Sequence, residues 1–184
     1  PQIADLAFGD FAGYLNVPAG DYTADVAVAG GSPIVFDDVP LTLEAAMSYS
    51  VYAVGEVANI NLQVLTEARR PIATAAQLQI VHASPSAGNV DVYLTATDDI
   101  SSADPVFTDI PFDAQALAST GSVQVAPGEY FATVTATGTK DAAIGPVALT
   151  LDALGIYTIV ATDSDGGGLP PQVILLDDLA PAQP

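Results

Sequence analysis

The chain has 184 residues, half of them apolar, and its 22 acidic side chains against three Lys and Arg give a net charge of -19. This charge argues against nucleic-acid binding, because phosphate contacts need clustered Lys and Arg. Cysteine is absent, which excludes disulfides, thiolate catalysis and cysteine metal sites. No stretch reaches the roughly 20 apolar residues of a membrane span, so no membrane-spanning segment is expected.

Apolar and polar residues alternate along the chain with the period of two that is typical of half-buried β-strands. In chain order, the alternating runs lie at 22–28, 39–43, 49–53, 78–82 and 130–136. No segment has a convincing helical period. Short strands separated by turns rich in Gly, Pro and Asp predict an all-β fold of the sandwich type.

The chain also contains an internal repeat. At a constant offset of 108 residues, the matching pairs are 17–22 with 125–130, Leu41–Glu44 with Leu149–Asp152, and Tyr49 with Tyr157. Upstream, 6–8 matches 110–112 at an offset of 104, which indicates a short insertion in the second copy. The sequence therefore predicts two tandem copies of one β-module.

The copies divide the chain into a first repeat at 1–67, a linker at 68–76 and a second repeat at 77–184. The second repeat opens with two strands, at 77–84 and 89–96. At the offset of 108, their counterparts in the first repeat would lie before Pro1. The first repeat is therefore predicted to lack its opening strands.

The start of the chain and its few basic residues lead to expectations about processing and cleavage. It shows no signal peptide and begins with Pro1, so we expect a processed or trimmed piece of a longer precursor. If the linker is exposed, trypsin should cut rapidly after Arg69 and separate the repeats, whereas Arg70 is protected by the proline that follows it. Lys140, in a predicted hairpin loop, is a second candidate for cleavage.

Residues 79–85 read Gln-Ile-Val-His-Ala-Ser-Pro, and residues 89–93 read Asn-Val-Asp-Val-Tyr. This opening resembles that of a bacterial surface-domain family of unknown function, which continues with Pro-Ala-Gly-x-Tyr and Leu-Thr-Leu elements. The second repeat matches along its whole length, and the first only from its third strand onward. The resemblance implies immunoglobulin-like sandwiches, often paired in exported lipoproteins of marine and soil bacteria. It implies an extracellular or outer cell-surface location and no established activity.

The incomplete first repeat has an energetic consequence. In the second repeat the opening strands supply the apolar side chains Leu78, Ile80, Val90, Val92 and Leu94. Their burial is worth on the order of 10 kcal/mol at ~1.5–3 each, which rivals the whole stability of a domain, about 5–15 kcal/mol. Three resolutions are open: the precursor holds the missing strands, a neighbouring subunit donates strands through self-association at the open edges, or the 77–96 hairpin folds back onto the first repeat.

His82 is the single histidine and lies at a strand end. We interpret it as structural, because a lone histidine lacks the partners of a zinc site. The chain also has no Gly-x-Ser-x-Gly elbow. Glycosidase chemistry needs a matched carboxylate pair in a cleft, and the chain has no Trp to form a sugar platform. The sequence thus predicts a protein that is not an enzyme and has no cofactor, calcium being the one candidate.

The run Asp163 to Gly168 has the local composition of a calcium loop, without the flanking helices and closing Glu of the full motif. The hypothesis is weak calcium binding by Asp163 and Asp165. The alternative is that these residues form a solvated turn. The same alternative applies to the acidic doublets at 37–38, 98–99 and 177–178.

Tyrosines shared by both copies are predicted to serve the fold, with the ring in the core and the hydroxyl bonded to backbone. Tyr14, Tyr52 and Tyr93 are not shared. They are candidates for a sugar platform or an interface, against the alternative that they pack on a sheet face. The unshared loop at 96–109 is a further candidate.

The leading functional hypothesis is a non-enzymatic structural or adhesive protein that could self-assemble into a surface fibre by strand exchange. The alternative is a carbohydrate- or ligand-binding module. Assembly predicts an exposed strand edge and a concentration-dependent oligomer, whereas binding predicts a concave patch of exposed aromatic side chains.

Overall fold

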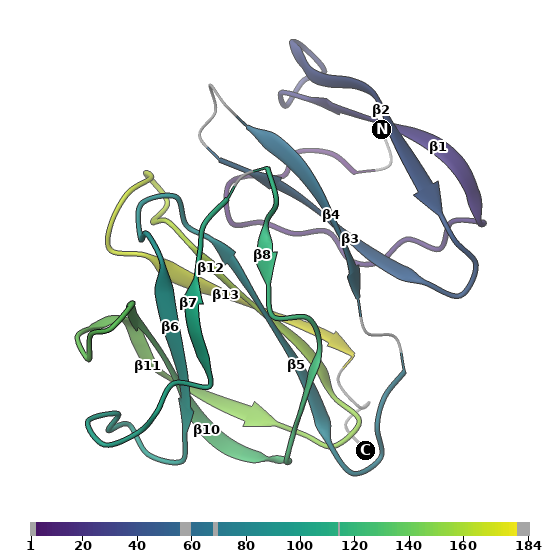
Figure 1. Cartoon of the computed structure of the whole chain (residues 1–184). Coiled ribbons are helices and arrows are strands. Elements are labelled where there is room, and N and C mark those ends of the chain that lie inside the picture. Colours follow the sequence, from purple (N-terminus) through teal and green to yellow (C-terminus); the bar gives the residue numbers. More distant parts are fainter. Residues whose placement is uncertain (1–2, 56–59, 68–69, 114, 180–184) are drawn as a thin grey trace. The chain divides into compact units, whose positions relative to one another are not determined.

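The structure is a computed structural model that describes residues 3–55, 60–67, 70–113 and 115–179, apart from the side chains of 177–179. All regular elements of the described residues are strands, which confirms the all-β prediction (Figure 1). None of the described elements is a helix that could span a membrane. Contacts divide the chain into two compact units, 1–49 and 50–184. This division follows contacts and the repeat boundaries follow sequence similarity, so those boundaries stay a prediction.

The first unit contains an antiparallel pair, β1 (Gly20–Ala27) and β2 (Ile34–Leu43). β1 starts after the Pro-Ala-Gly turn, where the Tyr22 hydroxyl donates to the Pro18 carbonyl oxygen at 2.8 Å. Residues 3–19 form no strand, and none of residues 3–49 is buried.

β3 (Ser48–Val54) crosses the border between the units and pairs with β4 (Asn61–Glu67). The strands that follow along the chain are β5 (Ala76–Ala83), β6 (Val90–Thr95), β7 (Phe107–Ile110), β8 (Ala118–Ser119), β9 (Val123–Val125), β10 (Gly128–Ala136), β11 (Ala142–Leu151), β12 (Ile156–Thr162) and β13 (Gln172–Leu179).

The second unit contains a β-sandwich. One sheet has the order β11-β10-β6-β7, and the other has the order β13-β12-β5-β8 with β9 also paired to β5. Apolar side chains of the two sheets meet in one core, for example Ile80 of β5, Val134 of β10 and Ile159 of β12. The period of two in the sequence thus places one face of each sheet in this core.

The outer face of the β5–β12 sheet is covered as well. Every residue of β5 and β12 is buried. Val81 and Val160, which point away from the main core, form a second apolar cluster with Val54 of β3, and Leu65 of β4 packs against it. The β3–β4 pair of the first repeat therefore covers a face of the second repeat.

The internal repeat is present in the hydrogen-bonded register. The β1–β2 pairs from Gly20–Leu43 to Ala27–Ile34 recur in β10–β11 at the offset of 108, with the same two irregularities. Ala46 and Leu154, which are equivalent, both have positive φ, 64° and 71°. Strands β1–β4 therefore correspond to β10–β13.

Strands β5 and β6 belong to the second repeat. β5 pairs in parallel with β12 and antiparallel with β8 and β9, and β6 lies between β10 and β7. Residues 77–96 therefore do not form the predicted hairpin, because β5 and β6 lie in different sheets. The alternative in which they fold back to complete the first repeat is also wrong, because both strands already have partners in their own repeat.

Candidate functional site

His82 is buried at the end of β5, with 1% of its surface exposed. Its Nε2 lies 2.7 Å from the Gly88 carbonyl oxygen, so Nε2 carries the proton, and the Ser84 amide donates to Nδ1 at 3.5 Å. Burial lowers the pKa of His82 below 6.5, although the Gly88 carbonyl and the charge of Asp163 act in the opposite direction. The neutral ring thus holds its own turn together.

Asp163 closes the same turn from the loop after β12. Its carboxylate accepts hydrogen bonds from the Ser84 hydroxyl, the Ser86 hydroxyl at 2.8 Å and the Gly168 amide at 2.9 Å. Burial works against the charged form, but these hydrogen bonds outweigh it and hold the pKa of Asp163 below its ordinary value. The carboxylate therefore ties the β5–β6 turn to the β12–β13 loop.

The contacts of His82, Ser84 and Asp163 do not form a nucleophilic triad. A triad requires the serine hydroxyl to donate to histidine and the carboxylate to hold the other ring nitrogen. Here Ser84 donates directly to Asp163, and His82 bonds only backbone atoms. An adjoining cavity of about 110 Å³ is lined mainly by apolar side chains such as Val134 and Leu169. In this geometry His82 does not contact the Ser84 hydroxyl and cannot activate it as the histidine of a triad does.

The two residues of the calcium hypothesis bind different partners. Asp165 accepts a hydrogen bond from Gln172 Nε2 at 2.8 Å, whereas Asp163 binds the serine turn. Among the described residues, the acidic side chains that meet in a group of three, with oxygens within 4.8 Å of one another, are the exposed Asp25, Asp37 and Asp38. Calcium binding by the loop stays a prediction, and the doublet at 177–178 lies outside the described side chains.

The three unshared tyrosines lie in different settings. Tyr14 is 52% exposed, Tyr52 is half-buried against the second apolar cluster, and Tyr93 is 2% exposed. Sugar stacking needs an exposed ring face, and of these three only Tyr14 is exposed. Tyr52 and Tyr93 therefore do not offer exposed ring faces on which a sugar could stack.

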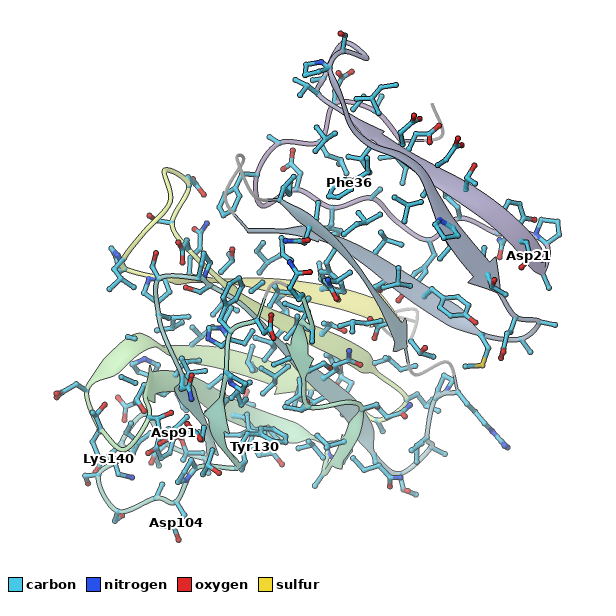
Figure 2. The ribbon with its side chains drawn as sticks, turned by 45° about the horizontal axis from the view of Figure 1, so that its top comes forward. Asp21, Phe36, Asp91, Asp104, Tyr130 and Lys140 are labelled. Carbon is cyan, nitrogen blue, oxygen red and sulfur yellow. The ribbon has the colours of Figure 1, made fainter. Side chains whose placement is uncertain are left out.

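Lys140 anchors the loop at 96–109 of the second repeat. Its Nζ donates to the carbonyl oxygens of Ile100, at 2.9 Å, and Ala103, and it lies 4.4 Å from the centre of the Tyr93 ring. Figure 2 shows Lys140 at the same end of the repeat as Asp91 and Asp104. The cation thus joins the loop to β6 through hydrogen bonds and a cation–π contact.

Two regions of the first repeat, which we together call the open side, lack the strand partners of their counterparts among the described residues: the edge of β1 that does not pair with β2, and residues 3–17. In the second repeat the counterpart of β1 pairs with β6, and the segment corresponding to 3–17 contains β7, β8 and β9, which pair with β5 or β6. In the described part of the first repeat, β1 pairs with β2 alone and residues 3–17 form no strand. The partners that these counterparts have in the second repeat are β5 and β6, which lie in different sheets.

Burial differs accordingly between equivalent residues. Leu6 is 50% exposed, whereas Ile110 is 9% exposed; Val26 is half-buried, whereas Val134 is 4% exposed. Large apolar side chains are exposed along the first segment, namely Ile3, Leu6, Phe8, Phe11, Tyr14, Leu15 and Val17. Exposed apolar surface and an unpaired strand edge are each typical of an interaction site.

Comparison with known families adds to this geometry. A family model described as a domain of unknown function (DUF4397) matches residues 2–93, which is half of the chain. The chain belongs to this family. The match covers β1 to β5 and runs into β6 as far as Tyr93. No curated protein matches the chain.

In this DUF4397 chain, a buried carboxylate that was not foreseen from the sequence holds β6 in place. Asp91 accepts hydrogen bonds from the Asp109 amide at 2.8 Å and the Gly138 amide at 2.9 Å. Burial opposes its charge, but the amides of Gly138 and Asp109, the Thr137 hydroxyl and Lys140 together lower the pKa of Asp91. The only sequence signal was its place in the Val-Asp-Val-Tyr motif.

Proposed function

We propose that this chain is a non-enzymatic structural or adhesive protein of the outer cell surface that self-associates through the open side of its first repeat. In this proposal its two repeats are tandem immunoglobulin-like sandwiches of an exported lipoprotein. Assembly into a fibre by strand exchange is the extended form of the same proposal.

The open side is the observation that carries the proposal. β1 presents one row of backbone amides and carbonyls that has no strand partner among the described residues. Phe8 and Phe11, within residues 3–17, are 56% and 61% exposed. A free strand edge adds strands from other chains, because main-chain hydrogen bonds supply affinity and apolar side chains add burial.

The net negative charge of the chain should make its self-association depend on the salt concentration. Two chains of net charge -19 repel each other. Salt shortens the range of this repulsion from about 8 Å at physiological ionic strength to about 3 Å at 1 M. We therefore expect association to strengthen as the salt concentration rises, which distinguishes it from assembly held by ion pairs.

The test is the mass of the full chain against concentration, by light scattering and electron microscopy, at low and high salt. We expect oligomers or fibres whose mass increases with protein concentration and with salt concentration. The variant Phe11→Asp should weaken assembly, whereas Leu169→Asp, which changes a 63% exposed residue of the second unit, should not. A chain that stays monomeric at micromolar concentration in high salt contradicts the proposal.

A further inference from the structure

The second repeat shows what the edge of β1 accepts, because its counterpart β10 is paired there with β6. The antiparallel register places Val92 opposite Val134, Asp91 opposite Thr135 and Val90 opposite Ala136. Val90 and Val92 lie in the core, and the Asp91 carboxylate accepts the two backbone amides of Asp109 and Gly138. The occupant of this edge is thus a strand that alternates apolar residues with one acidic residue.

The first repeat has residues equivalent in sequence and backbone conformation to both amide donors. Asp5 corresponds to Asp109 at the offset of 104, and the two have φ of 56° and 54°. Gly30 corresponds to Gly138 at the offset of 108, and both have positive φ, 96° and 77°. The turn bond also recurs: the Gly31 amide donates to Val28 at 2.8 Å, as Thr139 does to Ala136 at 3.0 Å. Among the described residues, no carboxylate accepts from the amides of Asp5 and Gly30.

β1 itself has the sequence pattern that this edge requires. Residues 24–28 read Ala-Asp-Val-Ala-Val, and residues 90–94 of β6 read Val-Asp-Val-Tyr-Leu. Both place an acidic residue between two apolar ones, with a third apolar residue two positions further on. Asp25 is exposed, and one of its oxygens accepts the Asp38 amide at 2.8 Å. Among the described residues no donor binds its other oxygen, so the carboxylate can accept further amides.

Placing a second β1 in the register of β6 gives a symmetric pair. The register of β6 on β10, moved by 108 residues, sets Asp25 of a second copy opposite Ala27 and sets Val26 opposite Val26 of that copy. Exchanging the two strands then leaves the pairing unchanged, which is the condition for a two-fold interface in which both copies use the same surface.

We propose that the first repeat binds a second copy of this chain through an antiparallel β1–β1 pair centred on Val26, in which Asp25 of each copy accepts the amides of Asp5 and Gly30 of the other. This inference rests on the proposed function, because it names the partner and the edge through which the open side associates. Ala24, Val26 and Val28 of the two copies form its apolar face, in the places that β6 and β10 fill in the second repeat.

The absence of cysteine in the chain makes the register directly measurable. The variant Val26→Cys should form a disulfide-linked dimer under mild oxidation, because directly opposed side chains have Cβ atoms about 4.5–5.5 Å apart. Ala24→Cys and Val28→Cys should each crosslink poorly alone and readily when mixed, since the register places 24 opposite 28. Val134→Cys is the matched control in the second repeat, where β6 already covers the edge, and should not crosslink.

A second pair of variants tests the carboxylate without depending on crosslinking. Asp25→Asn should raise the dimer dissociation constant by at least about tenfold, because a hydrogen bond to a charged acceptor is stronger than one to a neutral acceptor. Asp37→Asn removes a charge next to Asp25 and should tighten the dimer by reducing repulsion. Weakening of the dimer by both variants, or by neither, overturns the role given to Asp25.

The outcomes separate this proposal from the proposed function. If the chain assembles but Val26→Cys does not crosslink, or if 24 and 28 crosslink no better when mixed, the β1 register is wrong while assembly stands. If a synthetic peptide of residues 87–99 binds the chain while the chain itself stays monomeric, the edge accepts a strand of another source. That result overturns both the second copy as the partner and self-association as the function.

Discussion

Thr133 of β10 and Asp25 of β1 are equivalent residues, but the backbone opposite them offers an amide hydrogen only to Asp25. Asp25 accepts the amide of Asp38 at 2.8 Å. At the offset of 108, the position of Asp38 is taken by Pro146, which has no amide hydrogen. Thr133 is 2% exposed, and its hydroxyl has no hydrogen-bond partner among the described residues. The second repeat thus holds a buried polar residue where the facing backbone position offers no amide.

We expect Thr133→Val to leave the free energy of unfolding unchanged or to raise it by up to about 1 kcal/mol, because it removes a buried hydroxyl that bonds nothing. Thr135→Val, two residues along the same strand, is the control. Its hydroxyl donates to the Thr139 carbonyl at 3.1 Å, so its loss should cost about 1 kcal/mol. Urea unfolding of both variants measures the difference, and equal losses would mean that Thr133 has a partner.

His82 makes stability depend on pH near neutrality. Its pKa in the folded chain lies below the ordinary 6.5. Between these two pKa values the unfolded chain is protonated at His82, whereas the folded chain is not. Stability is therefore complete above about pH 6.5 and falls as the pH drops toward the lower folded pKa, by at most ~1.4 kcal/mol per pH unit. The lowered pKa values of Asp91 and Asp163 place their own loss at lower pH, below 3.8.

The measurement is the free energy of unfolding of the chain from pH 8 to pH 5, against that of His82→Gln. The Gln side chain can still donate to the Gly88 carbonyl but does not titrate, so its curve should be flatter over this range. Parallel curves for the two proteins would show that another group titrates there.

At the scale of elements, the sequence predicted well what depends on neighbours in the chain. The alternating runs at 22–28, 78–82 and 130–136 coincide with β1, β5 and β10, because the period of two is local. The contacts of Asp163 with Ser84, 79 residues away, and of Lys140 with Ile100, 40 residues away, leave no local pattern. They arise only when the sheets bring distant loops to one end of the sandwich.

Asp163 links the β5–β6 turn to the β12–β13 loop, and this link should contribute to the free energy of unfolding. We expect Asp163→Ala to cost about 2–4 kcal/mol, because it leaves the donors of Ser84, Ser86 and Gly168 without their charged acceptor. Asp165→Ala, at an exposed position two residues away, should cost less than about 0.5 kcal/mol.

The same two variants test calcium. A real site should raise the melting temperature as calcium saturates it, and the effect should vanish in either variant. Magnesium at equal ionic strength is the control, since screening of the net charge acts alike with both ions. Equal shifts from the two ions would remove the site.

At the scale of the molecule, the sequence repeats and the folded units do not coincide. β3 and β4 belong to the first repeat by sequence, yet Val54 and Leu65 pack with Val81 and Val160 on the second. The sequence could not predict this, because the apolar residues on both faces of β5 and β12 could equally indicate a strand buried within one domain. The predicted linker between the repeats therefore joins elements that are already in contact.

This packing predicts that the stability of the second repeat depends on β3 and β4. We expect the fragment 77–184 to be about 3–6 kcal/mol less stable than the fragment 48–184, because removing β3 and β4 exposes Val81 and Val160, at ~1.5–3 kcal/mol each. Urea unfolding of the two fragments measures the difference. Tryptic cleavage after Arg69, which lies outside the described residues, is the companion test on the whole chain, and its two products should elute together in gel filtration. Fragments of equal stability, or products that separate without denaturant, would mean that β3 and β4 do not stabilise the second repeat.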